Sequence, residues 1–450
     1  MSLLVSISGV RGIVGESLTP EVAVRYASAF AEYAGGGRIV LGRDGRVTGG
    51  PLANIISSTL VSMGCDVIAL GIVPTPTVGL TVEKMRAAGG ISVTASHNPM
   101  QWNGMKFIGQ SGMFLDGVEI VRLQRILAGP PPRYAPWDKT GRHTRDESAI
   151  GRHIDAVLSQ PLVRPDAIRK RSFTVVADCI NAAGGAVIPE LLRRLGCRVI
   201  GMNDEVGGIF SHDPEPIPGN LTALCAAVKQ HRADLGIAVD PDVDRLVFIT
   251  EKGEPFGEEY TVATAVNYVL GAGPRGGSPV VVNLSTTRAV DDIAARYGAP
   301  VHRTPVGEIN VAGRMKTLGA AIGGEGSGGV IFPALHYMRD AMAGIGLILS
   351  QIAEAGGTMS EFRASLPSYT IRKTSIRADG KDTAAMLDAV AERLSPTARC
   401  NMEDGVKFDF DDGWVHLRRS NTEPIVRIIA EARTPEAADA LLARFRNELG

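Results

Sequence analysis

Three aspartates, Asp240, Asp242 and Asp244, stand two residues apart in the run DPDVDR. In an extended segment this spacing sends all three carboxylates to one side, where they repel one another unless a cation neutralises them. Carboxylate oxygens without a nearby His or Cys favour Mg²⁺ over Zn²⁺. A solvated acidic turn is the alternative, but the apolar run 235–239 directly before the triplet favours a metal site.

A serine, Ser96, lies in the polar run 94–99 (TASHNP). It could be a nucleophile, a phosphate carrier or only a turn former, and on these residues alone the turn is favoured. Two nearby residues, Lys106 and His97, also have several possible roles. Lys106 could shuttle a proton or contact a phosphate, His97 is similarly open, and each could instead be an ordinary solvated side chain.

Cations and hydroxyls gather in residues 418–427 (RRSNTEPIVR). Arg418 and Arg427 can fork onto phosphate oxygens, while Ser420, Asn421 and Thr422 can donate hydrogen bonds to the remaining ones. An arginine-rich surface hairpin is the alternative. The run of hydroxyl, amide and hydroxyl between the two arginines favours a phosphate-binding loop.

A glycine-rich run covers residues 324–329 (GEGSGG). No Lys-Ser or Lys-Thr pair follows it, so it does not fit a P-loop. Glu325 accepts hydrogen bonds that a sugar can donate, and together with Ser327 it suits neutral hydroxyls better than phosphate. The alternative is a flexible turn.

The elements that must position these residues alternate between β-branched runs and helical periods, the pattern of βαβ units. We expect strands at 38–41, 66–70, 91–94, 174–177, 198–201, 235–239, 246–250, 279–284 and 320–322, and helices at 20–33, 186–195, 221–232, 286–297 and 341–355. Three of the polar loops each follow a predicted strand. Ligands gather beyond the carboxyl ends of strands in such sheets, so three α/β units could share one cleft.

Length and composition fit this reading. The 450 residues carry 47 Lys+Arg against 48 Asp+Glu, and a net charge of −1 argues against a nucleic-acid or polybasic membrane partner. No apolar run reaches the roughly 18 residues of a spanning helix, and the N-terminus does not resemble a signal peptide. The five scattered cysteines lack a C-x-x-C pair, which predicts a reducing cytoplasm without a disulfide framework or zinc site.

Taken together, and in their order along the chain (94–99, 240–245, 324–328 and 418–427), the four motifs resemble those of the α-D-phosphohexomutases. The supporting matches are GVRG at 9–12, GRDGR at 42–46, VPTP at 73–76 and FSHDPEP at 210–216. The resemblance covers essentially the whole chain. It implies three related α/β domains with mixed, largely parallel sheets and a C-terminal α+β domain around a central cleft. With the glycine- and proline-rich breaks in the sequence, it suggests units at 1–150 (phosphoserine), 151–253 (metal), 254–366 (sugar) and 367–450 (phosphate).

The resemblance also implies a role for each candidate residue. Ser96 would carry the phosphoryl group and hold Mg²⁺ with the three aspartates. Arg11, Lys106 and Arg245 would surround the phosphoryl group in transfer. Glu325 and Ser327 would bind ring hydroxyls, and Arg418, Ser420, Asn421, Thr422 and Arg427 would hold the other phosphate.

The implied activity is that of an isomerase of carbohydrate metabolism, which interconverts hexose 1-phosphate and hexose 6-phosphate through a phosphoserine and a 1,6-bisphosphate. Mg²⁺ would be the cofactor and hexose 1,6-bisphosphate the activator. The partners would be small sugar phosphates, with no nucleic acid or membrane, and the enzyme would be a monomer or homodimer.

Two positions depart from the family pattern. Gly329 stands where many relatives have a histidine, for which His336 could substitute unless it is a packing residue. Glu308 stands where some mannose/glucose enzymes have another histidine. We expect glucosamine phosphate as substrate, with phosphomannomutase/phosphoglucomutase activity as the alternative. A metal-dependent sugar phosphatase and a non-catalytic sugar-phosphate-binding protein are the alternatives from other classes.

Overall fold

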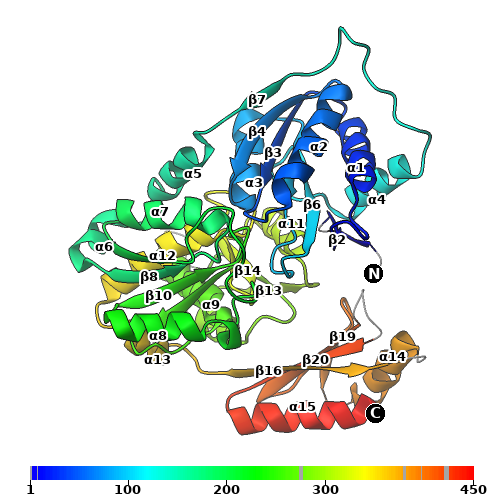
Figure 1. Cartoon of the computed structure of the whole chain (residues 1–450). Helices are drawn as coiled ribbons and strands as arrows, with labels where there is room; N and C mark the ends of the chain where they lie inside the picture. Colours follow the sequence, from blue (N-terminus) through cyan, green and yellow to red (C-terminus); the bar gives the residue numbers. More distant parts are fainter. Residues whose placement is uncertain are drawn as a thin grey trace.

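A computed structural model describes residues 3–7, 9–272, 277–378, 382–396, 398–419 and 425–449. Within these residues the strands form four separate sheets, which follow one another along the chain, with the first sheet at the top and the fourth at the bottom of Figure 1. The strands of each sheet lie inside one of the four predicted units. The mixed α/β architecture with a C-terminal α+β part is confirmed.

The first sheet has seven strands in the order β1-β2-β6-β5-β3-β4-β7. Its parallel half contains β3, β4, β5 and β7, and its other pairings are antiparallel. The elements of this unit are β1 (Leu4–Ser6), β2 (Gly9–Ile13), α1 (Pro20–Tyr33), β3 (Arg38–Arg43), α2 (Gly49–Ser62), β4 (Asp66–Ile72), α3 (Thr75–Met85), β5 (Gly89–Val93), β6 (Trp102–Ile108), α4 (Gly117–Leu127) and β7 (His143–Arg145).

The second sheet has the order β11-β10-β8-β9 and ends in an antiparallel pair, β10 with β11. The loop between those two strands carries the three aspartates. The elements are α5 (Ala149–Leu158), α6 (Pro165–Arg171), β8 (Thr174–Asp178), η1 (Ala183–Ala186), α7 (Ile188–Arg194), β9 (Arg198–Met202), η2 (Pro218–Asn220), α8 (Thr222–His231), β10 (Leu235–Val239) and β11 (Leu246–Thr250).

The third sheet, of order β13-β12-β14-β15, repeats that plan with an antiparallel pair at its edge. One hydrophobic core runs from the second unit into the third, around the almost wholly buried helix α12. The elements are α9 (Glu258–Ala272), β12 (Val280–Asn283), α10 (Ala289–Arg296), β13 (Val301–Thr304), α11 (Glu308–Leu318), β14 (Ile322–Glu325), β15 (Gly329–Ile331), α12 (Ala341–Ala355) and α13 (Met359–Ser365).

The fourth sheet is antiparallel throughout, in the order β16-β20-β19-β18-β17. Helix α15 lies along its outer side, and its other face is turned toward the first three units (Figure 1). The elements are β16 (Thr370–Arg377), α14 (Thr383–Leu394), β17 (Arg399–Asn401), β18 (Val406–Asp409), β19 (Gly413–Arg419), β20 (Ile425–Ala432) and α15 (Pro435–Leu449).

Most predicted elements form, and the helices expected at 20–33 and 341–355 have the predicted bounds. One prediction was displaced. The strand expected at 320–322 begins at its last residue and continues to Glu325, because β14 pairs with β12 on one side and with β15 on the other. The glycine-rich loop is therefore only the turn 326–328, and Glu325 is a strand residue.

No helix among the described residues combines the length and the apolar character that crossing a membrane requires.

Candidate active site

The three aspartates meet at one place. Asp240, Asp242 and Asp244 are buried, and each offers a carboxylate oxygen within 4.8 Å of the others. The carboxylates were predicted to converge because an extended segment would send them to one side. This explanation was wrong, because the segment is a tight turn. Val243 adopts φ +61°, a conformation that is costly for a β-branched residue, and its amide donates to the carbonyl of Asp240 at 3.0 Å. The turn, not strand alternation, makes the carboxylates converge.

A buried lysine from the first sheet neutralises part of this charge. Nζ of Lys106, on β6, lies 2.6 Å from Oδ2 of Asp242 and 3.0 Å from Oδ2 of Asp244. Burial disfavours the ammonium ion, but the two carboxylates outweigh burial and hold the pKa of Lys106 above its ordinary value. Lys106 is therefore a charged part of the site, and the prediction of an ordinary solvated lysine is excluded.

The hydroxyl of Ser96 reaches the same cluster. Its Oγ donates to Oδ2 of Asp240 at 2.8 Å. Burial and the charges of Asp244 and Asp242 hold the pKa of Asp240 well above its ordinary value. Asp242 and Asp244 each keep a buried oxygen, Oδ1, that has no hydrogen-bond partner among the described residues. Crowded carboxylates with unpartnered oxygens, and a hydroxyl beside them, fit a hard divalent cation.

An ion pair beneath Ser96 shapes its loop. Ser96 has φ +50°, and the fully buried guanidinium of Arg46 donates to its carbonyl at 2.8 Å and also to that of Asn98. Arg46 is paired with Asp44, which accepts a hydrogen bond from Thr94 at 2.6 Å. These contacts hold the loop in a left-handed bend that presents the hydroxyl to the aspartates.

Two further cations contact the Ser96 loop, one at Asn98 and the other at His97. Arg11 donates to Oδ1 of Asn98 at 3.0 Å. Arg245 donates to Nδ1 of His97 at 2.8 Å and pairs with Glu215 at 3.2 Å. Because Nδ1 of His97 accepts from a guanidinium, this nitrogen carries no proton. Burial and the charges of Arg245 and Arg11 hold the pKa of His97 well below its ordinary value.

A buried arginine that the sequence reasoning missed joins the aspartates to the sugar loop. Arg339 donates to Oδ2 of Asp244 at 2.7 Å, to Oε2 of Glu325 at 2.9 Å and to Oε2 of Glu308 at 3.0 Å. Burial raises the pKa of Glu308 to about 7, against the opposing effect of Arg339. The signal was the RD pair at 339–340, but nothing local in the sequence indicates partners that are 95, 31 and 14 positions away.

The strand position of Glu325 fixes its carboxylate. Oε1 accepts from Asn283 and from the amide of Gly307, each at 2.8 Å. The following turn rests on buried Glu259, and a Cβ at Gly326 would overlap that carboxyl group, so a larger residue there would have to displace Glu259. Ser327 lies on this turn, half-buried.

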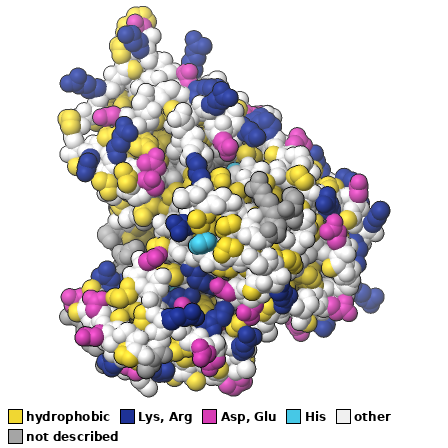
Figure 2. Space-filling view, turned by 180° about the vertical axis from the view of Figure 1, so that it is seen from behind, with side chains coloured by type: hydrophobic (Ala, Val, Ile, Leu, Met, Phe, Trp, Pro, Cys, Tyr) yellow, Lys and Arg dark blue, Asp and Glu magenta, His cyan; other side chains and the backbone are white. Residues whose placement is uncertain are grey.

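The two predicted phosphate-binding arginines are register partners. Arg418 on β19 stands directly opposite Arg427 on β20, so both belong to the sheet face away from α15. Ser420, Asn421 and Thr422 lie outside the described residues. Figure 2 shows the molecule hollowed between its C-terminal part and the rest, with Lys and Arg side chains beside the hollow.

A second buried cluster, of two histidines and one aspartate, has a structural role and does not fit a metal. Nε2 of His153 and Nε2 of His336 each lie 2.9 Å from Oδ2 of Asp340, and all three residues are buried. The amide of Met338 donates to Nδ1 of His336 at 3.0 Å, so the proton of this ring is on Nε2, the nitrogen a metal would need. Of the two alternatives for His336, the structure therefore favours the packing residue.

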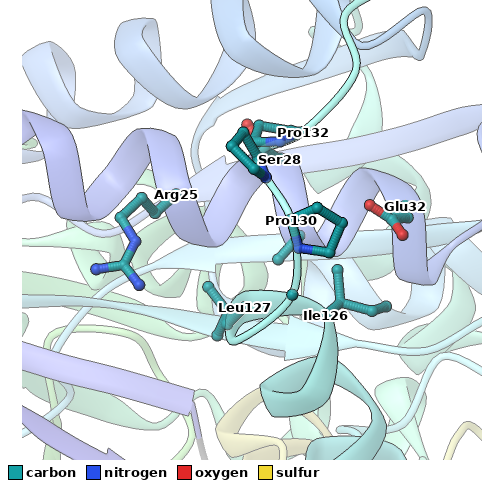
Figure 3. A pocket seen from close by; sticks show the side chains of 10 residues that line it. Arg25, Ser28, Glu32, Ile126, Leu127, Pro130 and Pro132 are labelled. Atoms are coloured by element: carbon teal, nitrogen blue, oxygen red, sulfur yellow. The ribbon is translucent and has the colours of Figure 1, made fainter.

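The hollow shown in Figure 3 is remote from this chemistry. It has a volume of about 320 Å³ and lies between α1, which contributes Arg25, Ser28 and Glu32, and the chain after α4. None of the predicted site residues that the structure describes lines it.

Four family models match the chain in order: Phosphoglucomutase/phosphomannomutase, alpha/beta/alpha domain I at residues 3–129, domain II at 151–253, domain III at 257–369, and the C-terminal domain at 375–448. The fold and the clustered loops define a four-domain phosphosugar mutase. The chain belongs to the phosphoglucomutase/phosphomannomutase family, the α-D-phosphohexomutases.

Individual relatives cover almost the whole chain. A Methanopyrus kandleri protein named "Probable phosphoglucosamine mutase" is 37% identical over 97% of this chain and 96% of its own. The "Phosphoglucomutase/phosphomannomutase" of Thermococcus kodakarensis is 39% identical with the same coverage. Among solved structures, a phosphoglucomutase/phosphomannomutase family protein from Burkholderia thailandensis matches with a TM-score of 0.84, 25% identity, and coverage of 99% of this chain and 98% of that one.

Proposed function

We propose that this protein interconverts hexose 1-phosphate and hexose 6-phosphate through phospho-Ser96 and a hexose 1,6-bisphosphate. The observation that carries this proposal is the contact of Ser96 Oγ with Asp240, beside two aspartates that Lys106 already holds. A hydroxyl in that position is suited to carry a phosphoryl group, because the transferred group needs neutralising charge and in-line positioning more than covalent help.

The balance of the reaction is simple. In the first half, the bond from phosphorus to Ser96 Oγ breaks and a bond to the free hydroxyl of the sugar phosphate forms. That hydroxyl gives up one proton and the departing Ser96 oxygen takes up one, so the step neither gains nor loses a proton overall. The bisphosphate then reverses its ends in the cleft, and Ser96 takes the phosphoryl group from the other end. Hexose 1,6-bisphosphate would therefore also activate an unphosphorylated enzyme.

Asp240, Asp242 and Asp244, with an oxygen on Ser96, would hold Mg²⁺. When bound, this ion supplies Lewis-acid stabilisation of charge on the phosphoryl oxygens. Lys106, Arg11 and Arg245 add fixed positive charge around the same group, and Lys106 also orients two of the aspartates. Because Nδ1 of His97 accepts from Arg245, we assign His97 a part in orienting that arginine.

The sugar and the second phosphate would occupy the other side of the cleft. Glu325 is fixed by Asn283, Gly307 and Arg339 and would accept hydrogen bonds from ring hydroxyls, with Ser327 beside it. Arg418 and Arg427, with Ser420, Asn421 and Thr422, would bind the phosphate that is not transferred. We propose 1–150, 151–253, 254–366 and 367–450 as the limits of the phosphoserine, metal, sugar and phosphate domains.

We propose glucosamine phosphate as the preferred substrate, supported by the GEGSGG form of the sugar loop and by the name of the Methanopyrus relative. The name of the Thermococcus relative, like the SNT run at 420–422, supports glucose and mannose phosphates as the alternative. Coupled assays on the three 1-phosphates, with Mg²⁺ and glucose 1,6-bisphosphate, test both. Release of inorganic phosphate in place of hexose 6-phosphate would instead indicate the sugar phosphatase.

A further inference from the structure

Asp404 lies where the fourth unit touches the third, in the turn between β17 and β18. Its Oδ2 accepts two hydrogen bonds, from Nε of Arg418 at 2.8 Å and from the backbone amide of Val306 at 2.9 Å. Arg418 belongs to the fourth unit and Val306 to the third. One carboxylate oxygen therefore connects a phosphate-binding arginine to a backbone amide of the neighbouring domain.

The turn that carries Asp404 is itself fixed. Nε2 of His416 donates to the carbonyl of Asp404 at 2.6 Å, and the other ring nitrogen of His416 bonds Oγ of Ser285, on the third unit, at 2.8 Å. At Gly405 the backbone has φ +72°, and a Cβ there would overlap the carbonyl of Leu417. Asp404 is thus held from both domains and has little freedom to follow a moving partner.

The peptide that Asp404 contacts also holds the sugar site. The amide of Val306 donates to Asp404, and the next amide, of Gly307, donates to Oε1 of Glu325 at 2.8 Å. Two consecutive amides therefore point to the two ends of the proposed substrate site. This dipeptide is therefore one of the links that set the distance between the sugar-binding carboxylate and the arginine that binds the phosphate.

Asp404 contacts Arg418 at Nε and not at the terminal nitrogens of the guanidinium. A carboxylate on Nε fixes the plane of the guanidinium, whose terminal nitrogens are the ones that reach outward to a phosphate. A guanidinium that is oriented before the ligand arrives loses less rotational freedom on binding. Both side chains are only about one-fifth exposed, so solvent screens the pair less than it would a surface pair.

We infer that Asp404 is a positioning residue for the non-transferred phosphate of the substrate, acting through Arg418 and Val306. This inference rests on the proposed function and deepens it. It assigns to Asp404 the spacing between the hydroxyl-binding and phosphate-binding ends of the cleft, and hence part of the selectivity for a phosphorylated hexose.

The test is a double-mutant cycle with Asp404→Ala, Arg418→Ala and the double variant. Glu403→Ala is the matched control, because it removes one negative charge from the exposed neighbouring position of the same turn. Steady-state kinetics on glucose 1-phosphate, with Mg²⁺ and saturating glucose 1,6-bisphosphate, give KM and kcat. Calorimetry with glucose 6-phosphate gives affinity, and thermal melting reports stability.

We expect Asp404→Ala to raise KM about tenfold with a much smaller change in kcat, and to weaken glucose 6-phosphate binding by a similar factor. In the Arg418→Ala background, the same substitution should add less than about twofold, because residues that act through one another are not additive. Asp404→Asn keeps an acceptor oxygen and should recover part of the loss. Glu403→Ala should match the wild type.

An effect of Asp404→Ala that equals that of Glu403→Ala, or that adds fully to Arg418→Ala, would overturn the inference. So would a fall in kcat alone that accompanies a lower melting temperature. A wild-type protein that turns over none of the hexose phosphates would contradict the proposed function instead, and calorimetry would still show whether Asp404 supports phosphate binding.

Discussion

Oγ of Ser96 lies 2.8 Å from Oδ2 of Asp240, a contact between two side chains that are 144 positions apart in the chain. Ser96 comes from the loop after β5, in the first sheet, and Asp240 from the turn after β10, in the second. Neither loop makes a reactive centre alone. Among the described residues, Ser96 supplies the only hydroxyl group that is hydrogen-bonded to Asp240, and this contact places it beside the three carboxylates. Ser96 is therefore the first residue to test.

Ser96→Ala should abolish most turnover and leave sugar-phosphate binding largely intact, because the methyl group fits the same bend but cannot carry a phosphoryl group. Intact-mass measurement should find a fraction of wild-type protein heavier by one phosphoryl group, and this fraction should be missing from the variant. Near-wild-type turnover by Ser96→Ala would contradict the phosphoserine mechanism.

Asp242→Asn should lower turnover and weaken its dependence on Mg²⁺ without unfolding the protein. The substitution relieves repulsion among the three carboxylates, but it also removes one of the two acidic partners of Lys106, so we expect little net change in melting temperature. Titration of activity with Mg²⁺ checks this. An unchanged rate and an unchanged titration would mean that the aspartates do not bind the metal.

Arg427→Ala should lower kcat/KM by one to two decades, since a hydrogen bond between charged partners is worth on the order of 1.5–3 kcal/mol. Both reaction directions should suffer equally, because the equilibrium constant cannot change. Calorimetry with hexose phosphate and with free hexose separates the phosphate contact from the sugar contacts.

Arg419→Ala is the matched control for this arginine. Strand alternation places Arg419, which pairs with Val426, on the opposite face of the sheet from Arg418 and Arg427. The Arg419→Ala variant should therefore bind hexose phosphate like the wild type, and Arg419 cannot compensate for the loss of Arg427. Equal affinity of wild type and Arg427→Ala for the phosphorylated sugar would mean that the phosphate binds elsewhere.

Lys407→Met should remove a pH dependence of stability in the C-terminal sheet. Lys407 is 1% exposed, and its Nζ lies 4.7 Å from the ring centre of Trp414 and 3.7 Å from Oδ1 of Asp409. Burial, helped by the charge of Arg303, outweighs this carboxylate and lowers the pKa of Lys407 to about 7. Between this pKa and the ordinary lysine pKa of about 10.4, the Lys407 side chain is neutral in the folded protein and protonated in the unfolded chain. The contribution of Lys407 to the free energy of unfolding therefore rises with pH in this range.

The measurement is urea unfolding of both proteins at pH 7 and pH 10. The difference in stability between wild type and Lys407→Met should shift in favour of the wild type at the higher pH. A pH-independent difference would show that Lys407 keeps its ordinary pKa in the folded protein.

The sequence predicted the parts of the site that depend on local pattern. The apolar run 235–239 and the acidic residues after it are enough to place a carboxylate turn at the end of a strand, and period-two and period-3.6 alternation located most elements. The geometry inside the turn was not predictable in this way, because φ +61° at Val243 depends on packing that surrounds a fully buried side chain.

Contacts between domains were beyond the sequence for a different reason. Arg339 and Asp404 look like ordinary charged residues until docking brings Asp244 to the first and the amide of Val306 to the second. The burial of Arg339 is tolerable only because its carboxylate partners are buried with it. The end of β14 was misplaced for a similar reason, since the pairing of Gly323 and Gly324 with β12 and β15 extends a strand that glycine propensity would stop.

The ion pairs of Lys106 have a consequence for synthesis of the chain. Its two carboxylate partners are 136 and 138 residues further on, so a ribosome has completed the first sheet long before either exists. An unpaired ammonium group cannot be withdrawn from water without a penalty of several kcal/mol, so the nascent first domain must keep this edge hydrated. The ammonium group of Lys106 loses its hydrating water only when the turn 240–244 docks beside it. Release of that water and completion of the reactive centre are then a single event, and a polypeptide that ends before residue 240 lacks the carboxylates that complete the cleft.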